Sequence, residues 1–110
     1  MKTIKLEFDF LIGPIVKEVF SISQNKLITG VYAIDNDIEL NKLNEKACSL
    51  YSSFYEFGTG EACTFNKKIA IQHKDELSEL MNKIIERLNT LNDGTYSVRD
   101  LTKDQLDNIN

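Results

Sequence analysis

The first residues of the chain alternate between apolar and polar positions with a period of two. Ile4, Leu6, Phe8, Phe10 and Ile12 fall on one side, with mostly charged residues between them. Successive side chains of a β-strand point to opposite faces, so this pattern predicts a strand over residues 4–12 with one face on a core. The Gly-Pro pair at 13–14 should end the strand, because proline has no backbone N–H to donate.

Two segments rich in β-branched residues follow. Residues 15–22 and 27–34 flank the polar run Ser-Gln-Asn-Lys at 23–26, which is typical of a hairpin with a short connection. Gly30 lies inside the second segment, where a glycine often marks a β-bulge. The first third of the chain is therefore expected to consist of antiparallel strands.

From residue 36 the apolar positions recur at steps of three and four. This spacing predicts an amphipathic helix over residues 36–57. Asn36 and Glu39 have the spacing of a capping box at its start, and the Gly-Thr-Gly run at 58–60 should end it. The predicted inward stripe consists of Leu40, Leu43, Ala47, Leu50, Tyr51, Phe54 and Phe57.

A second helix is predicted from Lys74 to about Leu91, with the Asn-Asp-Gly run at 92–94 as its end. The residues before it fit two patterns. Cys63 and Phe65 alternate as in a strand, whereas Ala70 and His73 would align with a helix that starts early. We expect an extended or irregular segment to about residue 72. The inward side chains of the second helix are expected to be Leu77, Leu80, Met81, Ile84, Ile85, Leu88 and Leu91.

The end of the chain predicts a short strand at 96–98 and a brief helix in which Thr102 and Gln105 form a capping box. Together the elements predict one α+β domain over residues 1–110. Its N-terminal antiparallel strands and hairpin would pack against two long amphipathic helices, with a short strand and helix at the C-terminus. A hydrophobic fraction of 42% with 27% charged residues is sufficient for a core that needs no metal or disulfide.

The two cysteines, Cys48 and Cys63, are expected to be reduced. No charged and then apolar leader opens the chain, so we expect a cytoplasmic protein. Charged residues interrupt every apolar segment well short of the roughly 20 residues that cross a bilayer, so no membrane span is expected.

The formal net charge is −4, and it is unevenly distributed. Residues 1–34 carry four lysines against three acids, whereas the remainder carries nine basic against fourteen acidic residues. Nucleic-acid binding depends on clustered Lys and Arg, so this balance argues against it. An acidic helical region favours a basic protein partner, although a solvated acidic surface that keeps the protein soluble is an alternative explanation.

Asp35, Asp37 and Glu39 alternate like the ligands of a calcium loop. Such a loop needs glycine at its sixth position and glutamate at its twelfth, and these positions are Leu40 and Lys46. These acids are therefore expected to cap the helix rather than to bind a cation. Two cysteines and one histidine without paired spacing predict no zinc site, and no cofactor is expected.

An enzyme remains an alternative. Cys63 and His73 could serve as nucleophile and base, although no third orienting group accompanies them. A buried cysteine and a histidine at a helix start would explain the same two residues.

The sequence favours recognition through exposed acids and one tyrosine. Phe54 and Phe57 continue the helical stripe, whereas Tyr55 falls off it beside Glu56, as an interface anchor would; Tyr55 could also pack under the loop at 58–60. The predicted partner-binding residues are Asp37, Glu45, Tyr55, Glu56, Glu76, Glu79 and Glu86.

In overall style the chain resembles the immunity proteins of bacterial contact-dependent and related polymorphic toxin systems. The resemblance rests on the segments Leu-Ile-Gly-Pro-Ile-Val-Lys-Glu-Val-Phe (11–20), Lys-Leu-Ile-Thr-Gly (26–30) and Ile-Asp-Asn-Asp (34–37) in a small acidic chain. It implies an inhibitor that occludes a toxin domain, often a basic nuclease. One alternative uses the same acidic surface: an accessory protein of a phage or mobile element that inhibits a host factor. Another is a homo-oligomeric structural subunit, in which the two helical stripes pack between chains and the acids keep the assembly soluble.

Overall fold

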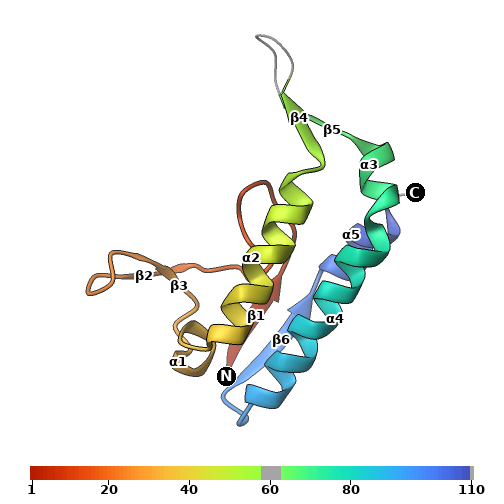
Figure 1. Cartoon of the computed structure of the whole chain (residues 1–110). Helices are drawn as coiled ribbons and strands as arrows, with labels where there is room; N and C mark the ends of the chain where they lie inside the picture. The colour runs from red at the N-terminus through yellow and green to blue at the C-terminus, as the bar shows by residue number, and fades with distance from the viewer. Residues whose placement is uncertain (58–62, 110) are drawn as a thin grey trace.

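Helices α2 (Ile38–Ser52) and α4 (Lys74–Leu91) lie side by side across a sheet of two strands, β1 (Lys2–Leu6) and β6 (Tyr96–Asp100) (Figure 1). This computed structural model describes residues 1–57 and 63–109, without the side chain of Cys63. The mixture of helices and strands confirms the α+β class. The buried core between helices and sheet includes Ile4, Leu6, Leu40, Ala47, Leu77, Met81, Ile84, Leu88 and Tyr96.

Strand β1 pairs with β6 in parallel, with Ile4 opposite Val98. The first strand is thus shorter than the predicted 4–12, and its partner in the sheet comes from the end of the chain. The chain leaves the strand direction in a tight turn, where Asp9 and Ile12 form an isolated bridge and Leu11 has a φ of 60°. Phe8 is still buried, but Ile12 is 54% exposed.

The predicted hairpin is present but short. Strands β2 (Val19–Ser21) and β3 (Lys26–Ile28) pair antiparallel and project away from the helices (Figure 1). The predicted continuation of the second strand to residue 34 is wrong, because α1 (Tyr32–Asp35) begins there. The Asp35 carboxylate accepts hydrogen bonds from Thr29 and Gly30, which turns the chain before α1. Gly30 therefore lies in this turn, at φ 88°, and not in a bulge.

Helix α2 is capped by Asp37, whose carboxylate accepts from the Leu40 amide at 2.8 Å; the predicted cap, Asn36, is one residue too early. The helix ends at Ser52 rather than at 57, since the Ser53 hydroxyl donates to the Leu50 carbonyl and competes with the helical pattern. Strand β4 (Tyr55–Phe57) follows, and Phe57 is 68% exposed instead of buried. The predicted end at 58–60 lies outside the described residues.

Both patterns in the sequence before α4 occur, one after the other. Strand β5 (Cys63–Phe65) pairs antiparallel with β4, and then α3 (Lys67–Gln72) begins. The predicted extended run to residue 72 is therefore wrong beyond Phe65, because the Asn66 side chain accepts from the Ile69 amide and caps α3. Helix α4 starts at Lys74 and ends at Leu91, which confirms its predicted bounds.

Helix α5 (Thr102–Asp107) closes the chain against α4. No capping box forms, because Asp100 accepts hydrogen bonds from the Thr102 amide and hydroxyl. Gln105 instead pairs with the backbone of Phe8 at both ends of its amide, at 2.7 and 3.1 Å. The C-terminal helix thereby holds the chain directly after β1.

Candidate partner-binding surface

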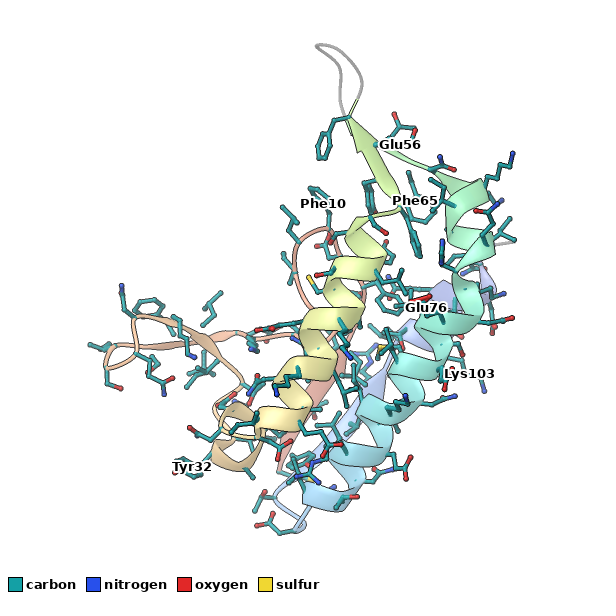
Figure 2. The ribbon with its side chains drawn as sticks, in the orientation of Figure 1. Phe10, Tyr32, Glu56, Phe65, Glu76 and Lys103 are labelled. Atoms are coloured by element: carbon teal, nitrogen blue, oxygen red, sulfur yellow. The ribbon has the colours of Figure 1, made fainter. Side chains whose placement is uncertain are left out.

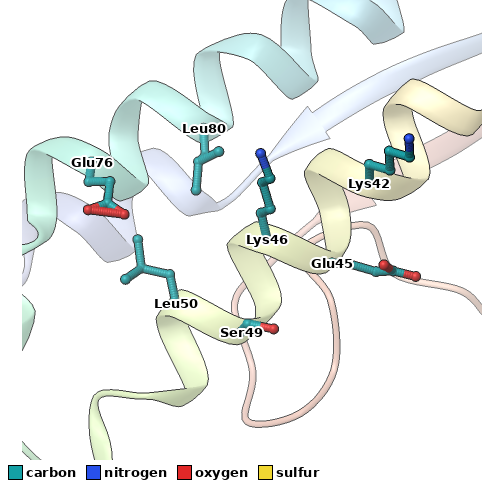
Figure 3. Close-up of a pocket in the computed structure, with 7 residues that line it drawn as sticks. All are labelled: Lys42, Glu45, Lys46, Ser49, Leu50, Glu76 and Leu80. Atoms are coloured by element: carbon teal, nitrogen blue, oxygen red, sulfur yellow. The ribbon is translucent and has the colours of Figure 1, made fainter.

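A hollow of about 830 Å³ lies between helices α2 and α4. Figure 3 shows Leu50 and Leu80 directed toward one another from the two helices, with Lys46 and Glu76 on either side of them. Glu45 extends away from α4 in the same view. Residues 42, 46 and 50 recur every four positions, as do 76 and 80, so each set forms one row along its helix. The lining residues are Lys42, Glu45, Lys46, Ser49, Leu50, Glu76 and Leu80.

A second hollow, of about 330 Å³, continues between the same helices toward the start of α2. It is lined by Glu39, Leu43, Lys83, Glu86, Arg87 and Thr90. We refer to the residues of both hollows as the α2–α4 groove. The groove presents four acids and four bases, so it is mixed in charge and not acidic as the sequence suggested. Lysines of both helices lie among the glutamates once the helices pair.

Some charges of the groove have an opposite charge within 4.0 Å, whereas others have none among the described residues. Arg87 lies 3.5 Å from Glu39, and His73 lies 3.6 Å from Glu76. Among the residues that the structure describes, no ion pair within 4.0 Å involves Lys42, Glu45 or Lys46. These three side chains are available to a partner, around an apolar floor.

The Asp37 carboxylate is already engaged in hydrogen bonds within the protein. Its carboxylate accepts from Arg87 at 2.7 and 3.0 Å and from the Leu40 amide, and its side chain is only 12% exposed. The hydrogen bond from Arg87 holds the pKa of Asp37 below its ordinary value. Contact of Asp37 with a partner stays a prediction, but both carboxylate oxygens already have donors.

The other predicted residues divide between two regions. Glu45, Glu76 and Glu86 line the α2–α4 groove. Glu79 is exposed next to the groove and lies 3.9 Å from Lys83. Tyr55 and Glu56 lie instead on β4, beyond the C-terminal end of α2 (Figure 2).

Tyr55 is packed in an aromatic cluster and is not a freely exposed anchor. Its ring lies 5.1 Å from that of Phe65, and its hydroxyl lies 3.1 Å from the Tyr51 hydroxyl. Tyr51 stacks on Phe8 at 4.9 Å. Burial, followed by the hydrogen bond with Tyr55, raises the pKa of Tyr51. Glu56 accepts a hydrogen bond from Asn66 at 2.6 Å, which links β4 to the start of α3.

Sequence reasoning missed Lys42, Lys46 and the two leucines as groove residues. The four-residue spacing of the lysines on one helix was the available signal. Which residues of α4 lie opposite them depends on how the helices pack, which the sequence does not specify.

The distance between Cys63 and His73, on which the enzyme alternative depends, is not defined by the described residues. His73 joins α3 to α4, with its ring 6.4 Å from that of Phe54, and its Nδ1 faces Glu76. The Cys63 side chain lies outside the described part of the structure. Within the described residues, no three His, Cys, Asp or Glu side chains are grouped to hold a metal ion, and no helix is long and apolar enough to cross a membrane.

Comparison of the chain with protein-family models, curated proteins and solved structures found no match.

Proposed function

We propose that the chain is a binding protein of the immunity type, which neutralises a bacterial toxin domain in the cytoplasm by covering it with the α2–α4 groove. The observation that supports this proposal is the apolar floor of Leu50 and Leu80, surrounded by charges of both signs that have no ion-pair partner among the described residues. Protein interfaces combine a buried apolar centre with a polar rim of complementary charge.

The net charge of the protein and the individual charges of the groove have different roles in binding. The net charge of −4 attracts a basic domain over long range and accelerates association. Within the groove, Lys42 and Lys46 fix the orientation, because they require acids of the partner where Glu45 and Glu76 require bases. Inhibition follows from occlusion, so none of these residues needs to be catalytic.

The test begins with recovery of the tagged protein from cells that encode it, and with mass spectrometry of stoichiometric partners. The expected result is a basic protein that arrests growth when expressed alone and no longer does so when this chain is co-expressed. Recovery of the chain alone, or of a partner whose effect on growth is unchanged, contradicts the proposal.

Charge reversal then tests the groove. The double variant Glu45→Lys/Glu76→Lys is expected to weaken binding at least about tenfold, since both charges then repel the partner. The matched control is Asp104→Lys/Asp107→Lys, which makes the same change in net charge on α5. Equal weakening by the two double variants would mean that only net charge matters and that the groove is not the interface.

A further inference from the structure

A separate hollow of about 390 Å³ lies on the aromatic side of the molecule. It is lined by Tyr51, Tyr55, Phe65, Lys67, Gln105, Asn108 and Ile109, and we call it the tyrosine pocket. It shares no residue with the α2–α4 groove. The end of α2, β4, β5, the start of α3 and the end of the chain all contribute to it.

The walls of the tyrosine pocket are held in place by packing. The rings of Tyr51 and Tyr55 meet that of Phe65 at centroid distances of 6.1 and 5.1 Å, the latter edge to face. Gln105 is fixed by its two hydrogen bonds with the backbone of Phe8. A ring-shaped ligand would therefore meet preformed aromatic surfaces, which lowers the entropic cost of binding.

The polar groups of the pocket favour an anion. The hydroxyls of Tyr51 and Tyr55 are 3.1 Å apart and share one hydrogen bond, which leaves one hydroxyl hydrogen free to donate. The Tyr51 hydroxyl is protonated at neutral pH, as that of any tyrosine is, so it can donate to an acceptor. The ammonium of Lys67 adds a positive charge and further donors.

The absence of acids sets this pocket apart. No carboxylate lines it among the described residues, although the chain has 17 acidic and 13 basic residues. Each of the four other hollows described has at least one Asp or Glu in its lining. The lining itself therefore adds no repulsion for an anion, but Asp9, outside the lining, contributes to the raised pKa of Tyr51, and Lys67 has to outweigh its charge.

We propose that the tyrosine pocket binds a small aromatic carboxylic acid, with its ring against Phe65 and Ile109 and its carboxylate at Lys67 and the tyrosine hydroxyls. A single lysine matches the single charge of a carboxylate better than the double charge of a phosphate monoester. This site does not depend on the proposed immunity function.

The probe pair for the test is 4-fluorophenylacetate and its neutral analogue 4-fluorophenylacetamide, followed by fluorine NMR with the whole protein. We expect saturable binding of the acid with a Kd on the order of millimolar, and weaker binding of the amide. Equal affinity for acid and amide, or no saturation for the acid at concentrations up to about tenfold higher than that Kd, overturns the proposal.

Two neighbouring lysines provide the matched variants. Lys67 lines the pocket and Lys68 does not, and both are exposed on α3, so neither change should affect folding. Lys67→Met is expected to raise the Kd of the acid about fivefold, whereas Lys68→Met leaves it unchanged. An unchanged Kd in Lys67→Met would contradict the site.

Discussion

The guanidinium of Arg87 and the carboxylate of Asp37 form a two-pronged ion pair that joins α4 to the beginning of α2. Arg87 Nε donates to Asp37 Oδ2 at 3.0 Å, and Nη2 donates to Oδ1 at 2.7 Å. The Leu40 amide donates to the same Oδ2 at 2.8 Å. The Asp37 carboxylate thus caps α2 and also holds α4 through Arg87. A single substitution of Asp37 removes both interactions.

Substitution of Asp37 tests these two tasks. Asp37→Ala is expected to lower the free energy of unfolding by about 1–2 kcal/mol, since the helix cap is lost as well as the ion pair. Arg87→Met should cost less, because the cap remains. The double variant should lose less than the sum of the single losses in urea denaturation. Additive losses would show that the two residues are not coupled.

The same pair predicts a pH dependence. Arg87 depresses the pKa of Asp37 in the folded state, so the unfolded state takes up the proton first as the pH falls. The stabilisation is therefore complete above the unfolded pKa of about 3.9 and is lost as the pH falls through the lower folded pKa. Urea midpoints of the wild type and Asp37→Asn should differ at neutral pH and converge in acid. If the difference between the two urea midpoints did not change with pH, the stabilisation could not be assigned to ionised Asp37.

Gly13 is predicted to tolerate no side chain because of one neighbour. An added Cβ would lie 2.4 Å from Nδ2 of Asn44, which cannot retreat because its Oδ1 accepts from the buried Ile15 amide at 3.0 Å. Gly13→Ala should lower the free energy of unfolding by about 1–3 kcal/mol. The same change in an Asn44→Ala background should cost clearly less, because the clash is gone. An equal cost in the two backgrounds, measured by urea denaturation, would locate the strain elsewhere.

The two long helices, α2 and α4, were largely predictable, because their apolar spacing continues over about four or more turns. The stripe of α4 and its bounds were read directly from the sequence, as were the buried positions Leu40 and Ala47 of α2 and Phe54 just after it. The errors lie where a short polar contact overrides the pattern. Ser53 ends α2 and the Asp35 carboxylate turns the chain before α1, although the apolar spacing continues through both positions.

The pairing of β1 with β6 was not predictable from local pattern. The two strands are more than 90 positions apart, and each has the same alternation that an antiparallel neighbour would produce. The candidate interface was equally hard to predict, because it too depends on contacts between segments that are distant in the sequence. Glu45 and Glu76 could be named as exposed acids, but their shared groove and its lysines depend on helix packing.

Leu11 is predicted to be a strained residue whose replacement stabilises the protein. Its φ of 60° is in the left-handed region that disfavours side chains, and its side chain is 71% exposed. Leu11→Gly should raise the free energy of unfolding by about 1 kcal/mol. Ile22→Gly is the control, since Ile22 is 89% exposed without a positive φ and gains no relief. A thermal midpoint that falls for Leu11→Gly as much as for Ile22→Gly would show that the turn is unstrained.

The Tyr96 hydroxyl completes the C-terminal end of α4. It donates to the carbonyl of Leu88, which lies in the last turn of the helix, where carbonyls lack partners further along the helix. Tyr96 is buried in β6, so this bond ties the helix to the sheet. Tyr96→Phe should lower the free energy of unfolding by about 1–2 kcal/mol, because a buried acceptor loses its donor. Tyr32→Phe, at a side chain that is 81% exposed, should change nothing. Hydrogen exchange of the last turn of α4 should accelerate in Tyr96→Phe only; equal protection in both variants would show that the hydroxyl does not hold the helix end.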